Sequence, residues 1–256
     1  MSIFRSETAS SAFASVVSQD CTLCGVRARE SLCTDCHNDL PVRTTSGCPR
    51  CDVEGNSQQE CGACLADPPY FDETISAFYY AYPLDRLVQA YKFNAHLSLL
   101  PLLADGLIGA IVRHGSTGAR PDLVIPLPLA PRRLAERGFN QSSLVAERVA
   151  STLGIRFEAR GMLRVRETPP QSGLSRQARL KNVRGAFDCS KRLDGMRVAV
   201  IDDVMTTGAT LSEAAKALKK AGAAFVSAWV IARAAKDETG TGAAASAVPF
   251  DDVQER

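Results

Sequence analysis

Eight of the nine cysteines of this chain lie before residue 65 and form four Cys-x2-Cys pairs. The pairs are Cys21/Cys24, Cys33/Cys36, Cys48/Cys51 and Cys61/Cys64. A Cys-x2-Cys turn points two thiolates at one cation, and two such turns complete a tetrahedral four-cysteine site. The spacing therefore predicts two structural Zn²⁺ ions, with no ligand position left for a catalytic water.

The spacing favours metal sites built from adjacent pairs, 21/24 with 33/36 and 48/51 with 61/64, because shorter loops cost less entropy to close. It does not exclude an interleaved pairing. Redox-active thiols are the alternative, but four pairs in series favour zinc ribbons. His37 is expected to be a surface residue, and Cys189, far from the other cysteines, a small apolar one.

The same cysteines bear on the compartment. Disulfide frameworks are typical of short secreted chains, whereas residues 1–20 are rich in Ser and Ala and lack the apolar stretch of a signal peptide. We therefore expect a reducing, cytoplasmic location. We also expect no membrane insertion, because no apolar run approaches the roughly 18 residues that span a bilayer.

Composition predicts four segments. Residues 1–20 are expected to be disordered, and residues 21–68 to be a double zinc ribbon whose metals supply the folding free energy that its few aliphatic side chains cannot. The composition changes at Asp67-Pro68-Pro69, where we expect a domain of residues 69–235 to begin. Residues 236–256 are expected to be a flexible tail.

Within 69–235, short apolar runs alternate with helical periodicity. Strands are predicted at 75–82, 122–126, 197–201 and 225–232, and helices from 84 to about 113 with a break near 93–94, at 141–153 and at 211–221. Alternation at crossover-length spacing predicts an α/β domain with a largely parallel sheet.

Charge is unevenly distributed. The chain has a formal net charge of +2, but residues 131–197 hold 15 basic and 6 acidic residues, while residues 1–70 hold 5 basic and 9 acidic ones. The basic stretch indicates an anionic partner, either a phosphorylated small molecule or a nucleic acid; a plain solvated surface fits the charge equally well.

The most specific chemical signal follows the strand predicted at 197–201. Asp202 and Asp203 are succeeded by a small hydroxyl- and glycine-containing loop, residues 206–210, and then by a helix. Loop amides and the positive end of a helix suit a phosphate monoester, and Gly208 lets the backbone approach it. The carboxylates suit sugar hydroxyls and a divalent cation, so together these features fit a ribose 5-phosphate. An ordinary strand–turn–helix is disfavoured because adjacent acids ending a buried strand are costly unless paired or liganded.

The run VAVIDDVMTTGAT (198–210) resembles the phosphoribosyl-pyrophosphate (PRPP) motif of type I phosphoribosyltransferases. Tyr91-Lys92-Phe93, IPLPLAPRRLAERGFNQ (125–141), ETPPQSGLSRQARLKNVRGAF (167–187) and the cysteine pairs in front make residues 20–235 similar to the ComF/GntX family. The resemblance implies a type I phosphoribosyltransferase-like α/β fold. Its mainly parallel twisted sheet would be flanked by helices and preceded by a small Cys-rich double zinc ribbon.

The resemblance also implies roles for individual residues. Asp202 and Asp203 would be the catalytic pair that holds the ribose hydroxyls. The 5-phosphate would bind Thr206, Thr207, Gly208, Ala209 and Thr210. The turn Pro126-Leu127-Pro128-Leu129 would be the pyrophosphate loop, with Arg133, Arg137, Gly138 and Asn140 near it, and Lys92 would also bind PRPP. A mobile loop over the site would contain Gln171, Arg179 and Asn182. Read without the resemblance, Arg132, Arg133 and Arg137 fit a solvated helix face equally well.

The implied reaction transfers phosphoribosyl from PRPP to an unknown nitrogen acceptor, with Mg²⁺ as cofactor and release of pyrophosphate. Two other functions stay open: a competence-type protein that binds single-stranded DNA during natural transformation, and a PRPP sensor without turnover. The predicted ribbon is acidic and lacks aromatic platforms for bases, which weighs against direct contact between the ribbon and DNA.

Overall fold

A computed structural model describes residues 18–45, 47–55, 57, 59–114, 120–168 and 176–235. The chain divides into two compact units, one ending at Asp39 and the other beginning at Leu40. Our expected domain limits, 21–68 and 69–235, group all four cysteine pairs together, whereas this division puts the last two pairs in the unit that holds the main sheet. Of the segments expected to be disordered or flexible, 1–17 and 236–256 lie outside the described residues.

The first unit is a small ribbon. Strands β1 (Gln19–Asp20) and β2 (Arg27–Ala28) pair antiparallel, and the short helix α1 (Thr34–Asn38) follows. The first cysteine turn lies between the two strands, closed by a hydrogen bond from the Gly25 amide to the Cys21 carbonyl (2.9 Å). β1 falls inside the stretch 1–20 for which we expected disorder.

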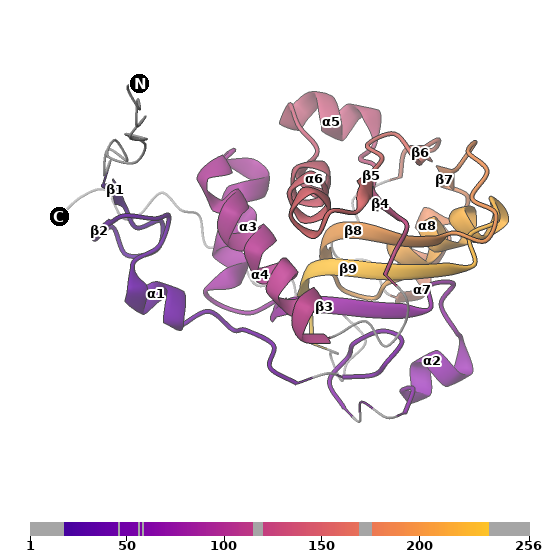
Figure 1. Cartoon of the computed structure of the whole chain (residues 1–256), viewed down its shortest axis with the longest axis horizontal. Coiled ribbons are helices and arrows are strands. Elements are labelled where there is room, and N and C mark those ends of the chain that lie inside the picture. The colour runs from indigo at the N-terminus through magenta and orange to yellow at the C-terminus, as the bar shows by residue number, and fades with distance from the viewer. Residues whose placement is uncertain are drawn as a thin grey trace, which may run out of the picture. The chain divides into compact units, whose positions relative to one another are not determined.

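The second unit is built on a five-stranded sheet of order β3-β9-β8-β4-β5, in which every pairing is parallel (Figure 1). The strands are β3 (Glu73–Tyr79), β4 (Leu123–Pro126), β5 (Arg156–Phe157), β8 (Arg197–Met205) and β9 (Phe225–Arg233). The α/β class with a mainly parallel sheet is confirmed.

Strand β8 is longer than the sequence predicts. Residues 198–201 form the continuous buried run typical of a central parallel strand, but pairing continues to Met205, which lies opposite Arg233 of β9. The strand extends because β9 runs equally far and supplies its ladder partners. Asp202 and Asp203 therefore lie within a paired strand, not after its end.

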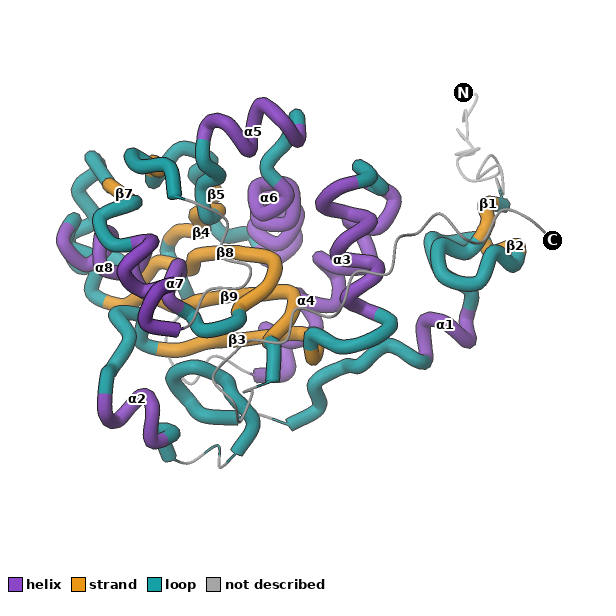
Figure 2. Tube along the Cα trace, turned by 180° about the vertical axis from the view of Figure 1, so that it is seen from behind, coloured by secondary structure: helices purple, strands orange, loops and turns teal. Residues whose placement is uncertain are grey.

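Helices cover both faces of the sheet, as the two opposite views in Figures 1 and 2 show. Helices α4 (Leu100–His114) and α6 (Gln141–Leu153) pack on one face, and α8 (Ala209–Lys220) packs on the other with α7 (Arg176–Val183) beside it. The remaining elements of this unit are α2 (Gly62–Ala66), α3 (Leu84–Phe93), the 3-10 turn η1 (Leu97–Leu99), α5 (Pro131–Arg137) and the antiparallel pair β6 (Leu163–Arg164) and β7 (Phe187–Asp188).

The expectation that no apolar run approaches the length of a membrane span is wrong. Leu97–His114, which joins η1 to α4, is long and apolar enough to cross a membrane by length and composition alone. A core helix passes the same test, and Leu99, Leu103 and Leu107 are completely buried here. The segment is therefore weak evidence for membrane insertion.

The second cysteine cluster is part of the main core. Cys48, Cys51 and Cys64 are buried in one hydrophobic cluster with Phe71, the inner side of α8 and the side chains of β8 and β9 that face it. The sequence around these cysteines contains few aliphatic residues. The apolar side chains that bury this cluster come from the sheet and from α8.

Candidate active site

The two aspartates of β8 are held by side chains from two different helices. The Asp203 side chain, on a residue only 6% exposed, accepts a hydrogen bond from Gln141 Nε2 (Oδ2, 2.7 Å) and pairs with Lys92 Nζ (Oδ1, 2.8 Å). The Asp202 carboxylate accepts from Ser142 Oγ (3.1 Å). Lys92 comes from the last turn of α3, and Gln141 and Ser142 from the first turn of α6. The acidic pair is thus fixed in place before any ligand arrives.

The first turn of α6 joins this pair to the loop that follows β4. Asn140 caps the helix, accepting from the Ser142 amide through Oδ1 (3.1 Å), and donates from Nδ2 to the Leu127 carbonyl (3.0 Å). Arg137 donates from Nη1 to Gln141 Oε1 (2.5 Å). One short segment, residues 137–142, therefore connects the aspartates with the loop predicted to hold pyrophosphate.

Burial dominates the electrostatics of Asp202. Burial first, and then the charge of Asp203, raises the pKa of Asp202 to about 7, while Lys92 opposes the shift. Burial and Asp203 also raise the pKa of Tyr91, whose hydroxyl donates to the Gln141 carbonyl (3.2 Å). A divalent cation or sugar hydroxyls at the aspartates would stabilise the ionised form of Asp202, which burial and Asp203 disfavour. This is expected of a site that binds such a ligand.

The predicted 5-phosphate loop connects β8 to the N-terminus of α8. Gly208 is the N-cap of α8 with φ +77°, and a Cβ there would lie 2.7 Å from Met205 Cε. Glycine is therefore favoured by its left-handed backbone, a reason that the sequence alone does not show, and the Met205 methyl would have to shift to admit a Cβ. The hydroxyl of Thr207 accepts from the Ala209 amide (3.4 Å), and Thr206 is exposed. Ala209 and Thr210 form the first turn of the helix.

The basic residues predicted to surround pyrophosphate separate into two groups. Arg132 is exposed and pairs with Glu136 along α5 (2.8 Å), as expected of a solvated helix face. Arg133 and Arg137 are only partly exposed, and Arg137 stacks on Phe93 with 5.1 Å from Cζ to the ring centroid. Pro128 and Leu129 lie in the partly exposed loop between β4 and α5.

Three site residues were missed by the sequence reasoning: Gln141, Ser142 and Arg164. The first two lie at the start of a helix, where a string ending in RGFNQ is the available signal. Arg164, in β6, stacks on Phe187 (5.4 Å), and its buried Nε has no hydrogen-bond partner among the described residues. Burial and Arg133 lower the pKa of Arg164, whereas Asp202 opposes this. This guanidinium adds positive charge beside the aspartates.

The predicted mobile loop is only partly described. Gln171 lies outside the described residues, and α7 contains Arg179 and Asn182. The Asn182 carbonyl accepts from Arg166 Nη2 (2.8 Å). The described part of this segment packs beside α8.

The cysteines form two four-thiol clusters with the pairing that short loops favour. Cys21, Cys24, Cys33 and Cys36 make one cluster, and Cys48, Cys51, Cys61 and Cys64 the other; within each, all Sγ atoms lie within 4.8 Å of one another. The Sγ atoms of Cys51 and Cys61 are 3.7 Å apart. This is far from a disulfide but close to the ~3.8 Å edge of a tetrahedron with Zn–S bonds of about 2.3 Å.

The donor chemistry of the second cluster also fits a metal. Burial, and then the charges of Cys51 and Cys48, raises the pKa of the Cys64 thiol. A divalent cation would offset both effects, and the Cys61 amide already donates to Cys48 Sγ (3.2 Å), as ligand sulfurs commonly require. His37 is exposed, as expected of a surface residue.

Comparison with known proteins identifies the family of this chain. Residues 140–242 match the phosphoribosyl transferase domain family. The DNA utilization protein YhgH of Salmonella typhi is 35% identical over 217 residues, which cover 83% of this chain and 89% of the relative. Competence protein F of Haemophilus influenzae is 32% identical over 213 residues, 81% of this chain and 92% of the relative. The chain belongs to the ComF/GntX family.

This ComF-family chain also has matches among solved structures. The glutamine PRPP amidotransferase from B. subtilis, complexed with ADP and GMP, matches 51% of this chain and 25% of its own, with 22% identity and a TM-score of 0.34. For the ComF-family chain itself, the phosphoribosyltransferase-type fold rests on the family match and on the parallel sheet described above.

Proposed function

We propose that this protein binds PRPP at the carboxyl ends of β4 and β8 and transfers its phosphoribosyl group to a nitrogen acceptor, releasing pyrophosphate. The observation that carries the proposal is the preformed pair Asp202/Asp203 near the carboxyl end of β8, ahead of the loop that opens helix α8. Lys92 and Gln141 hold Asp203, and Ser142 holds Asp202. In open parallel sheets, ligands bind beyond the carboxyl ends of the strands.

Each part of the substrate has a matching group on the protein. The ribose hydroxyls would donate to the carboxylates of Asp202 and Asp203. The 5-phosphate would lie on residues 206–210, where loop amides and the helix N-terminus offer positive charge. The pyrophosphate would face the loop at Pro128 and Leu129 and the guanidinium groups nearby.

The chemical step would be displacement at the ribose C1. The acceptor nitrogen forms a bond to C1 as the bond from C1 to the pyrophosphate oxygen breaks, and the nitrogen then gives up a proton. Fixed positive charges of Lys92, Arg137 and Arg164 near the site would stabilise the negative charge that develops on the leaving pyrophosphate. Such preorganised electrostatics would supply much of the rate enhancement.

Mg²⁺ fits the donor set at this site. Carboxylate oxygens are ligands that Mg²⁺ prefers, commonly together with substrate oxygens, and the two mutually repelling aspartates offer such oxygens. When bound, the ion would neutralise and orient the pyrophosphate.

A pyrophosphate-release assay tests turnover. Purified protein is supplied with PRPP and Mg²⁺ and screened against purine bases, primary amines, ammonia and glutamine. We expect release that depends on one acceptor class and is abolished in Asp203→Asn. PRPP binding without release for any acceptor would instead indicate a PRPP sensor.

A second candidate, binding of single-stranded DNA, is favoured by the names of two relatives, a DNA utilization protein and a competence protein. The 15 basic residues in 131–197 supply positive charge for it. Titration of a fluorescent oligonucleotide at two salt concentrations tests this function, since phosphate contacts make affinity fall steeply with salt. Absence of binding at low salt would exclude it.

A further inference from the structure

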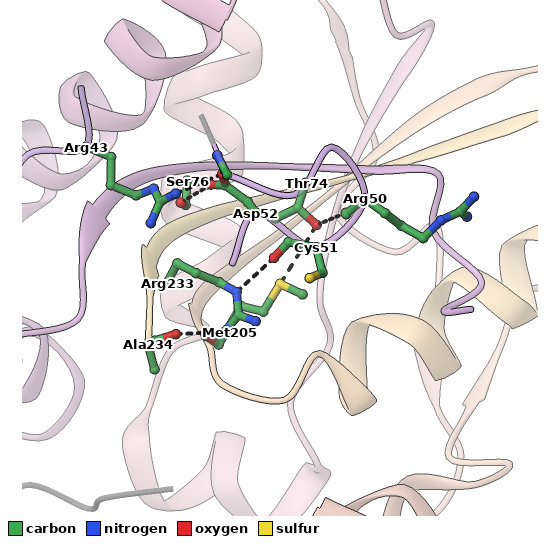
Figure 3. A network of polar contacts seen from close by, with 10 residues as sticks. Arg43, Arg50, Cys51, Asp52, Thr74, Ser76, Met205, Arg233 and Ala234 are labelled. Atoms are coloured by element: carbon green, nitrogen blue, oxygen red, sulfur yellow. Dashed lines mark hydrogen bonds and ion pairs between the residues drawn. The ribbon is translucent and has the colours of Figure 1, made fainter. Parts of the chain in front are cut away.

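Arg233, the last residue of β9, is a buried guanidinium that donates to backbone carbonyls. Figure 3 shows it beside three of the residues that accept, Cys51, Met205 and Ala234. Arg233 is 5% exposed. Nε donates to the Cys51 carbonyl (2.9 Å), while the two hydrogens of Nη1 are shared among the carbonyls of Met205 (3.0 Å), Ala234 (2.9 Å) and Thr206. Arginine alone offers several donors in a rigid planar fork, so one side chain joins a cysteine turn to the start of the predicted phosphate loop.

The cysteine turn is also fixed to β3, on its other side. The Asp52 carboxylate, adjacent to Cys51, pairs with buried Arg43 (3.0 Å) and accepts from Ser76 Oγ. Thr74 Oγ1 donates to the Arg50 carbonyl (2.7 Å). Figure 3 shows these contacts converging on one turn, residues 50–52. A shift of this turn would therefore move the Cys51 carbonyl that Arg233 binds.

On the loop side, the contacts set the direction of two amides. In a trans peptide, the carbonyl oxygen and the following N–H point to opposite sides. Arg233 donates to the carbonyls of Met205 and Thr206, so the N–H groups of Thr206 and Thr207 point away from it. These are the first two amides of the loop proposed to receive the 5-phosphate. The Met205 carbonyl also accepts from the Ala234 amide (3.0 Å), so the backbone helps Arg233 to hold it.

We propose that Arg233 is a positioning residue through which metal in the Cys48/Cys51/Cys61/Cys64 cluster orients the phosphate loop and sets affinity for the 5-phosphate of PRPP. The proposal rests on the PRPP function proposed above. A metal in this cluster would hold Cys51 in place. The Cys51 carbonyl would then hold Nε of Arg233, and Nη1 would hold the loop carbonyls. Within the described residues, none of the four ligands of the first cluster takes part in this network.

The first arm of the test changes Arg233. Lysine keeps the charge but cannot span the carbonyls of Cys51 and Thr206 together, so Arg233→Lys is expected to raise the Kd for PRPP with Mg²⁺ at least tenfold. Hydrogen exchange of the amides at 206 and 207 should accelerate, while the zinc content stays at two per chain. Arg192→Lys is the matched control, because the Arg192 side chain is exposed and, in the described part of the chain, pairs with Asp194; its Kd should stay within twofold of wild type.

The second arm removes the metal. Cys61→Ser keeps the Cys51 carbonyl but takes one ligand, so zinc should fall to one per chain and the same two amides should exchange faster. Adding Arg233→Lys to Cys61→Ser should raise the Kd by less than threefold, since coupled residues give non-additive effects. Fully additive losses, or an Arg233→Lys variant with wild-type affinity and amide exchange, would overturn the proposal.

The two proposals fail separately. If the wild-type protein does not bind PRPP, the proposed function is wrong, while amide exchange at 206 and 207 in Arg233→Lys still decides whether the residue positions the loop. If Cys61→Ser does not fold, the Arg233→Lys arm decides alone, with Arg192→Lys as its reference.

Discussion

Lys92 Nζ lies 2.8 Å from Asp203 Oδ1 and joins helix α3 to strand β8 across more than a hundred residues of sequence. The ion pair is partly buried: the Lys92 side chain is 18% exposed and that of Asp203 8%. Removing one partner of such a pair leaves the other charge uncompensated, which is costly.

The first prediction concerns Lys92. In Lys92→Met the pKa of Asp202 should rise above about 7, because Lys92 lowers it in the native protein. PRPP binding with Mg²⁺ should weaken at least tenfold at pH 7, and its pH midpoint should move upward. Calorimetric titrations from pH 6 to 9 measure both. Lys220→Met, at the exposed end of α8, is the control; an unmoved pH midpoint in Lys92→Met would contradict the assignment.

The second prediction is the pH dependence of stability. The folded-state pKa of Asp202, about 7, is above the ordinary 3.8. Its contribution to stability is therefore greatest below about pH 4 and is lost as pH rises through about 7. In Asp202→Asn this loss should disappear, so the melting temperature of the variant should exceed that of wild type at pH 8 but not at pH 4. Thermal unfolding at the two pH values checks this, and parallel curves would refute it.

The third prediction concerns Gly208. Gly208→Ala should destabilise the protein by about 1–2 kcal/mol from its left-handed backbone, and the Met205 methyl, 2.7 Å from the new Cβ, would have to shift. PRPP affinity should fall with it because the loop must shift. Denaturant unfolding and PRPP titration measure the two effects. Gly62→Ala, where a Cβ meets nothing within 4 Å, should be near neutral; equal losses in both would contradict the account.

The fourth prediction distinguishes the two metal clusters. We expect two zinc ions per chain, released to a chromophoric chelator in two phases. Cys24 of the first cluster is exposed, whereas three of four cysteines in the second are buried in the main core, so the first cluster should lose its metal first. Cys24→Ser should lack the fast phase. Loss of the slow phase in that variant would reverse the assignment.

The candidate site could be located from the sequence because its residues are close together in the chain. Asp202, Asp203 and residues 206–210 lie in one short stretch, between a buried strand and a helix. The parallel sheet was equally accessible, since short apolar runs at crossover spacing allow few arrangements.

What the sequence did not reveal depends on contacts across the fold. Gln141 is 62 residues from Asp203, yet the two are hydrogen-bonded, and no local pattern encodes which helix terminus meets which strand. The packing of the second cysteine cluster into the sheet's core, and the bonds from Arg233 to Cys51 and Thr206, were invisible for the same reason. The length of β8 was underestimated because its register against β9, which pairs Met205 with Arg233, is not encoded in its own apolar run.

The central claim is that the Asp202/Asp203 pair and the loop before α8 form a PRPP site, and calorimetric titration with PRPP and Mg²⁺ tests it most directly. We predict saturable one-to-one binding by the wild-type protein, at least tenfold weaker without Mg²⁺. In Asp202→Asn/Asp203→Asn it should be at least a hundredfold weaker, with folding unchanged by circular dichroism. Wild-type affinity for PRPP in that double variant would contradict the claim.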